Sequence, residues 1–225
     1  MKHVVVTGGT GALGTAVVET LLGRGMTVHL PIMEASLPAH LPWRDRVHAV
    51  PGVSLDDEQQ VVAFYRSLPA LWGSVHLVGG FAMAALTETT LADFEKQWRM
   101  NTVTCFLASR EAVRAIRASG GGGRIVNVAA RPAVTPTAGM IAYATAKAGV
   151  AALTQAIAAE VLADGILVNA VLPSIIDSPA NRAAMPKADH ASWPKPAQLA
   201  ETIAFLASDA NALTSGTLVP VYGRA

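Results

Sequence analysis

The sequence predicts an α/β fold, a doubly wound parallel sheet within a single domain of 225 residues. Short β-branched runs alternate with longer segments in which apolar residues recur every three to four positions, as in parallel strands joined by helices. The first run, residues 4–6, ends in a glycine-rich turn that opens a helical segment. Such turns lie at the ligand-binding edge of doubly wound sheets, and the chain is long enough for one such domain.

The predicted elements alternate along the whole chain. Apolar, β-branched runs predict strands at residues 4–6, 27–32, 47–50, 74–78, 124–129, 166–172 and 217–221. Helical spacing predicts helices at residues 15–24, 56–68, 91–118, 139–163 and 199–208, the first of which stops at Gly25. Residues 120–123 are a glycine loop, and residues 173–196 are rich in Pro, Ser and Asn, so we expect a substrate loop with short helices there.

Composition excludes several classes of function. The chain is 52% hydrophobic and 15% charged, with a net charge of +1 and no basic block, so nucleic acid is not an expected partner. No uninterrupted apolar run reaches the roughly 18 residues of a membrane span. The single Cys105 excludes an intrachain disulfide framework and fits a reducing compartment. We expect a cytoplasmic protein that acts on a small molecule and holds no metal.

The glycine-rich turn reads VVVTGGTGALG. Gly9, Gly11 and Gly14 satisfy the G-x-G-x-x-G pattern directly after a strand and before a helix. Glycine allows a tight turn and a close approach of the backbone to a pyrophosphate, whose charge faces the helix N-terminus. The turn therefore predicts a dinucleotide site. The residues expected to form it are Gly8, Gly9, Thr10, Gly11, Ala12, Leu13 and Gly14.

The choice between NAD and NADP stays open in the sequence. An acidic side chain after the second strand would bind the adenosine ribose of NAD, whereas Arg or Lys would favour the phosphate of NADP. Ile32 stands at the expected place and is neither. Glu34, two residues beyond, is either a ribose ligand or a solvated loop carboxylate. Arg44 and Arg46 are the alternatives for binding a phosphate.

Tyr143 and Lys147 lie four residues apart in a predicted helix, so their side chains share one face. A cation near a phenol lowers the pKa of the phenol and makes it a usable acid or base. Without further context, such a Tyr is more often a packing residue and such a Lys a surface residue. Beside a dinucleotide turn, the pair predicts hydride transfer to or from a carbonyl-like group.

Together with Asn101, these motifs resemble the short-chain dehydrogenase/reductase family over essentially the whole chain. Further segments that carry the likeness are WRMNTVTCF, GRIVNVAA, ILVNAVLPSIIDSP and AFLASDANALTSGTLVPVYG. The resemblance implies a Rossmann fold, an NAD(P)-dependent oxidoreductase and a homodimer or homotetramer. It assigns Tyr143 as proton donor or acceptor, and Lys147 as the residue that holds the nicotinamide ribose and lowers the tyrosine pKa.

The same resemblance implies that Asn101 binds a water molecule that links Lys147 to solvent. An Asn at this place can instead form a hydrogen bond with a helix backbone group. It completes the coenzyme site with Gly79, Pro173, Ile176 and Ser178, the last two beside the nicotinamide.

The sequence departs from the family pattern at several places. Ala12 replaces the middle glycine of the turn, Ser174 follows Pro173 where glycine is usual, and HLVG replaces Asn-Asn-Ala-Gly after the fourth strand. Ala130 stands where the family carries its catalytic Ser. Losing one such donor costs on the order of 10²–10³ in rate when charge develops on oxygen. Either Thr135, Thr137 or a water replaces it, or the substrate needs less polarisation.

Ala130 and three segments, AGMIAYATAK, GGFA and LPSIIDSPANRAAMPKADHASW, are similar to the dihydropteridine reductase branch of the family. The resemblance implies an easily reduced quinonoid ring as substrate. Trp193 and Met185 would either cover a flat ring or pack the loop down. Two alternatives stay open: an ordinary ketoreductase for ketones or 3-oxoacyl substrates, and a dinucleotide-binding sensor without turnover.

Overall fold

In the computed structural model, which describes residues 1–225, seven strands form one parallel sheet in the order β3-β2-β1-β4-β5-β6-β7. The order reverses between β1 and β4, and ligands bind at such a switch point in doubly wound sheets. The strands are β1 (His3–Thr7), β2 (Thr27–Pro31), β3 (His48–Val50), β4 (Leu71–His76), β5 (Gly123–Val128), β6 (Ile166–Pro173) and β7 (Leu218–Val221). The predicted α/β Rossmann fold in a single domain is confirmed.

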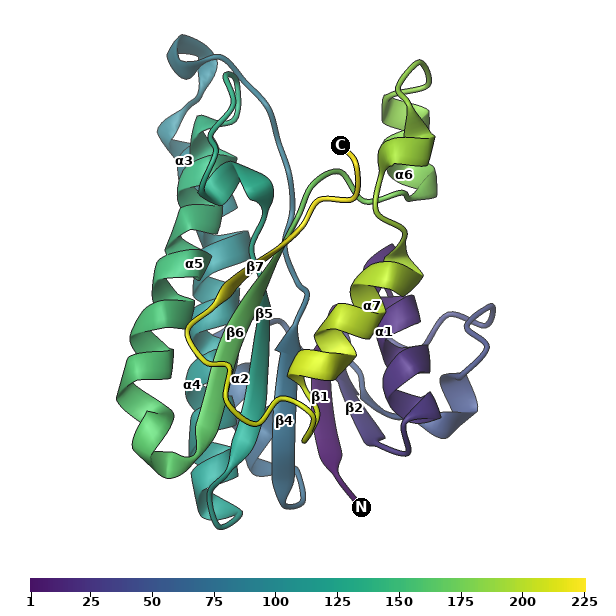
Figure 1. The fold of residues 1–225 in the computed structure, drawn as a ribbon, viewed down its shortest axis with the longest axis vertical. Coiled ribbons are helices and arrows are strands. Elements are labelled where there is room, and N and C mark those ends of the chain that lie inside the picture. The colour runs from purple at the N-terminus through teal and green to yellow at the C-terminus, as the bar shows by residue number, and fades with distance from the viewer.

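Helices cover both faces of the sheet (Figure 1). One face carries α1 (Ala12–Gly23) and α7 (Pro196–Leu206), and the other carries α2 (Glu58–Arg66), α4 (Thr104–Ala118) and α5 (Ile141–Val161). Above the carboxyl ends of the strands, α3 (Leu91–Trp98) and α6 (Pro179–Ala184) rise on opposite sides. Short 3₁₀ turns complete the chain: η1 (Arg44–Arg46), η2 (Leu86–Glu88), η4 (Arg131–Ala133), η5 (Leu162–Asp164) and η6 (His190–Ser192).

Strand β1 shows why the strands read as continuous apolar runs. Val4 and Val6 pack into the core on the α1 and α7 side, whereas Val5 packs into the core beneath α2, α4 and α5. Because successive side chains point to opposite faces, a strand covered by helices on both sides is apolar at most positions.

The predicted helix at residues 91–118 is not continuous. Between α3 and α4 the chain widens into a π-helical segment, η3 (Arg99–Val103), which contains Asn101. The side chain of Thr102 donates to the carbonyl oxygen of Ala146 on α5 at 2.8 Å, and Asn101 turns the other way, towards Gly80. Such bulges often mark functional sites. The predicted start of α5 at Gly139 is also wrong, because Gly139 has a left-handed φ of 77°.

The segment Ile141–Asp164, with a mean hydropathy of 1.3 over its most apolar window, is long and apolar enough to span a membrane by length and composition. The sequence contains no uninterrupted apolar run of this length, so no membrane span was expected. The segment passes by mean hydropathy because its alanines raise that mean, although polar residues interrupt it. In the fold, α5 packs along β6 and against α3, as the core helix of a sheet protein does.

A buried polar seam joins β4 to β5 in the middle of the sheet. His76 Nδ1 lies 2.8 Å from Asn127 Oδ1, and His76 Nε2 lies 2.8 Å from Ser74 Oγ. Asn127 donates in turn to the Thr154 hydroxyl on α5 at 2.9 Å. Burial lowers the pKa of His76 from 6.5 to about 4, because a charged imidazole would lose its hydration there.

Candidate active site

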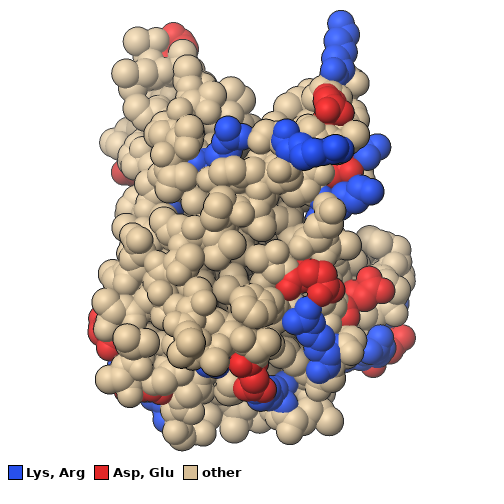
Figure 2. All heavy atoms as spheres, in the orientation of Figure 1, with Lys and Arg blue, Asp and Glu red and all other residues tan.

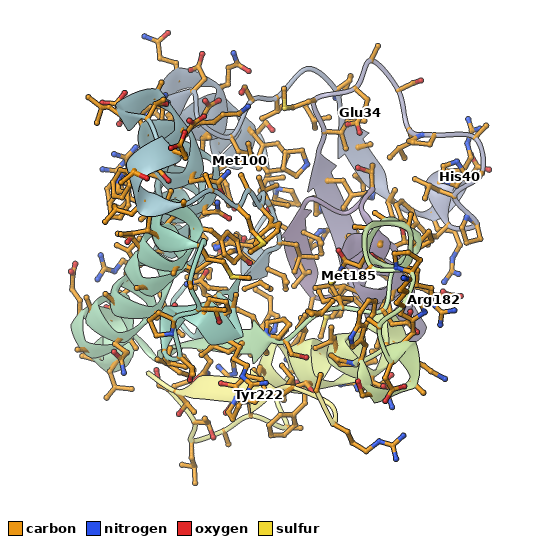
Figure 3. All side chains as sticks on the ribbon, turned by 90° about the horizontal axis from the view of Figure 1, so that it is seen from above. Glu34, His40, Met100, Arg182, Met185 and Tyr222 are labelled. Atoms are coloured by element: carbon orange, nitrogen blue, oxygen red, sulfur yellow. The ribbon has the colours of Figure 1, made fainter.

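The candidate site lies above the carboxyl ends of the strands, where the molecule is hollowed between two projections (Figure 2). Seen from above, Glu34 lies beyond the end of β2 and Tyr222 beyond the end of β7 (Figure 3). Met100 and Met185 come from opposite sides of this space, the first from η3 and the second from the segment after α6. The hollow therefore lies above the strand ends, between Met100 on one side and Met185 on the other.

The glycine turn between β1 and α1 has no room for side chains at three places. Gly8 has a left-handed φ of 69°. A Cβ on Gly14 would lie 2.1 Å from the carbonyl oxygen of Gly8, and a Cβ on Gly9 would lie 2.7 Å from Leu30 Cδ2. At Gly11 an added Cβ would make only an ordinary contact, 3.5 Å from Gly8 O. The backbone is therefore tightly folded against the strand and open towards solvent at Gly11.

The turn fits the pyrophosphate of a dinucleotide. Gly11 is the N-cap of α1, no side chain caps the helix, and no acidic residue stands in its first turn. The first backbone N–H groups thus stay available for an anion, and the helix dipole favours negative charge there. Ala12 is exposed at the start of α1, whereas Leu13 packs against the core.

The end of β2 carries a carboxylate that reaches back to the glycine turn. Ile32, at the position where the sequence pattern places a ribose ligand, is a core residue. The hydroxyl of Thr10 donates to Glu34 Oε1 at 3.3 Å, so Glu34 lies beside the turn rather than free in the loop. Arg44 pairs with Asp45 at 3.5 Å, and Arg46 makes no ion pair.

Lys147 and Asn101 converge on Gly79, which is exposed above the end of β4. A Cβ on Gly79 would lie 2.5 Å from Asn101 Oδ1 and 3.0 Å from Lys147 Nζ. Asn101 accepts from the backbone N–H of Gly80 at 3.2 Å and donates to its carbonyl at 3.1 Å and to that of Gln97 at 2.9 Å. The side chain therefore satisfies backbone groups, including one within its own helix, in addition to any role towards Lys147.

Tyr143 stands one helical turn before Lys147, and its ring packs edge-on against Phe81, with centroids 4.9 Å apart. Lys147 Nζ lies 6.0 Å from the centre of the Tyr143 ring and donates to the Val128 carbonyl at 2.9 Å. The predicted pair therefore shares one face, as expected from its spacing.

The predicted effect of Lys147 on the phenol differs from what the structure gives. Burial raises the pKa of Tyr143 to about 12, because a phenolate would be poorly hydrated there. Burial likewise lowers the pKa of Lys147 to about 8. In the chain by itself, burial sets the direction of both shifts, and the ammonium is directed at Val128 O.

Ala130 is buried at the end of β5, immediately before η4. The two threonines considered as replacements for its missing hydroxyl, Thr135 and Thr137, are exposed, and neither side chain makes a hydrogen bond within the protein. Arg131, the next residue, reaches across to the segment after β7 and donates from Nη1 to the Ala225 carbonyl at 2.7 Å.

The segment after β6 closes the hollow on its other side. Pro173 ends β6 and pairs with Val221, and Ile176 is partly buried. Ser178 is the N-cap of α6 and accepts from the Asn181 backbone N–H at 3.2 Å. Trp193 is only 5% exposed, and its ring centre lies 4.6 Å from that of His190. It therefore packs the loop against the body rather than covering the substrate space.

Sequence reasoning missed two residues of the site, Phe81 and Arg131. Phe81 follows two glycines in a loop, and only the bridge between Ala84 and Met140 brings that loop beside the start of α5. The sequence offered one hint of Arg131, which directly follows the unusual Ala130. Its partners, Tyr222 and Ala225, lie about ninety residues away in the chain, so their contact could not be predicted.

Residues 2–189 match the family model described as short chain dehydrogenase. The chain is 33% identical to the cis-4-hydroxycyclohexanecarboxylate dehydrogenase of Sinomonas cyclohexanicum, over 97% of this chain and 94% of that protein. It is 30% identical to the 3-beta-hydroxysteroid dehydrogenase of Comamonas testosteroni, over 96% of this chain and 92% of that protein.

Among solved structures, the chain is similar to a short chain oxidoreductase from Pseudomonas aeruginosa PAO1 with NADPH bound, described as containing an atypical catalytic center. The TM-score is 0.87 at 26% identity, and the match covers 99% of this chain and 95% of that one.

Proposed function

Because the chain belongs to the short-chain dehydrogenase/reductase family, we propose that its site reduces a ring carbonyl or a quinonoid ring, or oxidises the matching ring alcohol. Family membership makes the protein an NAD(P)-dependent oxidoreductase. The bound nicotinamide supplies or accepts the hydride. The observation that carries the proposal is that Lys147 shares one face of α5 with Tyr143 and converges with Asn101 on Gly79, beside a tight, uncapped glycine turn.

In this proposal Tyr143 moves a proton between its Oη atom and the substrate oxygen or nitrogen. Burial raises the pKa of Tyr143 to about 12, so the group is protonated at neutral pH and ready to donate. Lys147, with its pKa lowered to about 8 by burial, can pass on a proton near neutral pH. Asn101 holds the Gly80 backbone next to the ammonium of Lys147.

Two observations favour a ring as substrate. The first is local: Phe81 stacks edge-on against Tyr143 and leaves 56% of its surface exposed, so an apolar ring lies beside the proton donor. The second is that both curated relatives named above carry ring compounds in their names. Ala130 removes one hydroxyl donor, which a substrate that is easily reduced tolerates better than an ordinary ketone. A dihydropteridine-reductase-like activity is the narrowest form of the proposal.

The test is coenzyme oxidation with a panel of three acceptors: a 4-oxocyclohexanecarboxylate, a quinonoid dihydropterin and a linear β-ketoester. We expect turnover of at least one ring compound and the lowest kcat/KM for the linear ester. Tyr143→Phe should lower kcat by about 10²–10⁴-fold, the range typical of a general acid. Tight coenzyme binding with no turnover of any acceptor would favour the sensor and overturn the proposal.

Ala130→Ser separates the ring substrates from each other. If the natural substrate is a ketone and another donor already serves it, the added hydroxyl should change kcat little. A rise in kcat approaching the 10²–10³-fold attributed to one donor, seen with 4-oxocyclohexanecarboxylate and absent with the dihydropterin, would show that the unaltered site lacks a carbonyl donor. The quinonoid ring would then be the better candidate for the natural substrate.

For the coenzyme, we propose a preference for NAD over NADP. Glu34 is held beside the glycine turn by Thr10, where its charge would repel a phosphate on the adenosine ribose and its oxygens would accept the ribose hydroxyls. Initial rates with both coenzymes at equal concentration test this directly.

We also propose that the protein is a cytoplasmic homodimer or homotetramer. The outer surfaces of α4 and α5 form an apolar groove whose walls include Trp98, Phe106 and Leu153. Phe106, on α4, and Trp98, at the end of α3, are about two fifths exposed there, so the groove suits the same groove of a second copy. Light scattering should show a multiple of 23.3 kDa, and Leu153→Arg should return the chain to a monomer.

A further inference from the structure

The last residues of the chain run across the base of the substrate loop, residues 174–194. The carbonyl oxygen of Tyr222 accepts from the Ser174 hydroxyl at 2.7 Å, at the beginning of this loop. The backbone N–H of Arg224 donates to Ser192 O at 2.9 Å, near its end. We call residues 222–225 the strap. It therefore binds both ends of the loop at once.

The strap fits closely against the loop. Gly223 has a left-handed φ of 67°, and a Cβ added there would lie 2.6 Å from Ser192 O. The loop is also closed at its neck, where Asp177 N donates to Pro194 O at 3.0 Å. The segment between, which contains α6 and Met185, projects from the body as one arm (Figures 1 and 3). The arm joins the body only through this narrow base, to which the strap is hydrogen-bonded. A shift of the strap should therefore shift the arm.

Arg131 fastens this strap to the reaction centre. Its Nη1 donates to Ala225 O at 2.7 Å, and its guanidinium carbon lies 5.0 Å from the centre of the Tyr222 ring. Tyr222 packs at the edge of the small core cluster that contains Ala129. Arg131 follows Ala130 directly, so one side chain connects the end of β5 to the strap and hence to the loop.

Arg131 forms no ion pair with an Asp or Glu side chain, unlike several other arginines of the chain. Arg182, within the arm, is paired with Asp177, and Arg99, Arg110 and Arg117 are also paired with carboxylates. The contacts of Arg131 are to the main-chain oxygen of Ala225 and to the aromatic face of Tyr222. Both contacts are directional, which suits a role in holding geometry.

We propose that Arg131 is a positioning residue, which through the strap holds the substrate loop at the height that closes the hollow over the substrate. This inference rests on the proposed oxidoreductase site and adds a residue that acts on substrate affinity rather than on proton transfer. Arg131 touches neither of the groups proposed to move protons, Tyr143 and Lys147, so the chemical step should survive its removal.

The test compares Arg131→Ala and Arg131→Lys with the unaltered chain, using the panel compound that gives the highest kcat/KM. For Arg131→Ala we expect KM for that compound to rise about tenfold while kcat stays within about twofold, a change of the size expected from one charge-assisted hydrogen bond and one cation–π contact. Arg131→Lys keeps a cation over Tyr222 and should recover part of the loss. Arg117→Ala, which removes an arginine paired with Asp164 at the C-terminal end of α4, is the matched control and should leave KM unchanged.

Hydrogen exchange gives a second readout that needs no substrate. In Arg131→Ala, amides of residues 174–194 should exchange faster, while those of β1 and α1 exchange as before. Unchanged exchange in this loop would overturn the proposal, and so would a fall in kcat at constant KM, since Arg131 would then act in the chemistry. If no panel compound is turned over, the exchange experiment still decides whether Arg131 holds the loop, so failure of the proposed function is told apart from failure of the strap.

Discussion

The two halves of the site are built in opposite ways. On the proposed coenzyme side, seven consecutive residues from Gly8 to Gly14 form the turn, and its shape depends on Gly9 and Gly14, where no side chain fits. On the substrate side, η4, the loop after β6 and the strap come from three distant parts of the chain and meet through single hydrogen bonds. The first half is local and rigid, whereas the second is assembled by the fold and can be tuned one contact at a time.

The largest effect should come from Gly14→Ala on the coenzyme side. Its Cβ would lie 2.1 Å from Gly8 O, and since backbone meets backbone, neither group can move aside cheaply. We expect coenzyme affinity, measured by quenching of tryptophan fluorescence, to fall by about 100-fold or more. Gly23→Ala, at the other end of α1, is the control, because its Cβ meets nothing within 4 Å and the affinity should hardly change. Equal losses in both variants would show that the turn is not the rigid half.

The buried polar seam between β4 and β5 should make the stability of the protein sensitive to acid. His76 has a folded pKa of about 4, below its ordinary 6.5, so between these values the unfolded chain binds more protons than the folded one. Stability is therefore complete above pH 6.5 and is lost as the pH falls towards 4, by about 3 kcal/mol for this group. Urea unfolding at a series of pH values measures it. His76→Gln should flatten this slope, although His29, with its pKa also lowered to about 4 by burial, keeps part of it.

Glu34→Gln should change which coenzyme is used and little else. Removing one charge from the edge of the turn should raise the NADP-to-NAD ratio of kcat/KM by about five- to tenfold, the range expected for a charge pair near the surface. The measurement is initial rate against coenzyme concentration. A ratio that stays constant would mean that Glu34 serves only to hold Thr10.

The smallest effect should come from Gly223→Ala in the strap. The added Cβ would lie 2.6 Å from Ser192 O and the left-handed φ disfavours alanine, so the strap should shift by a few tenths of an ångström. We expect KM for the organic substrate to rise about threefold with coenzyme affinity unchanged, since strain of this kind costs about 1 kcal/mol. A loss of coenzyme binding in this variant would mean that the two halves are not independent.

Much of the fold could be predicted because it rests on short-range patterns. The strand order along the chain, the glycine turn and the one-turn spacing of Tyr143 and Lys147 all follow from periodicity. The break at Asn101 could not be predicted, since the π-helical segment is stabilised by contacts with Gly80 and with α5 that lie far away in the sequence. The pKa of Tyr143 was expected to fall and instead rises, because burial is a property of the packed fold and not of a four-residue spacing.

By itself, the sequence determined the parallel α/β architecture and the place of the glycine turn, and it predicted the pair Tyr143 and Lys147, because each depends on residues a few positions apart. Only the tertiary structure decided that Glu34 lies beside the turn, that Phe81 meets Tyr143 and that Arg131 reaches the strap. Loops have no periodicity from which their neighbours can be read. Their contacts are chosen by the sheet, which brings the carboxyl ends of its strands to one edge.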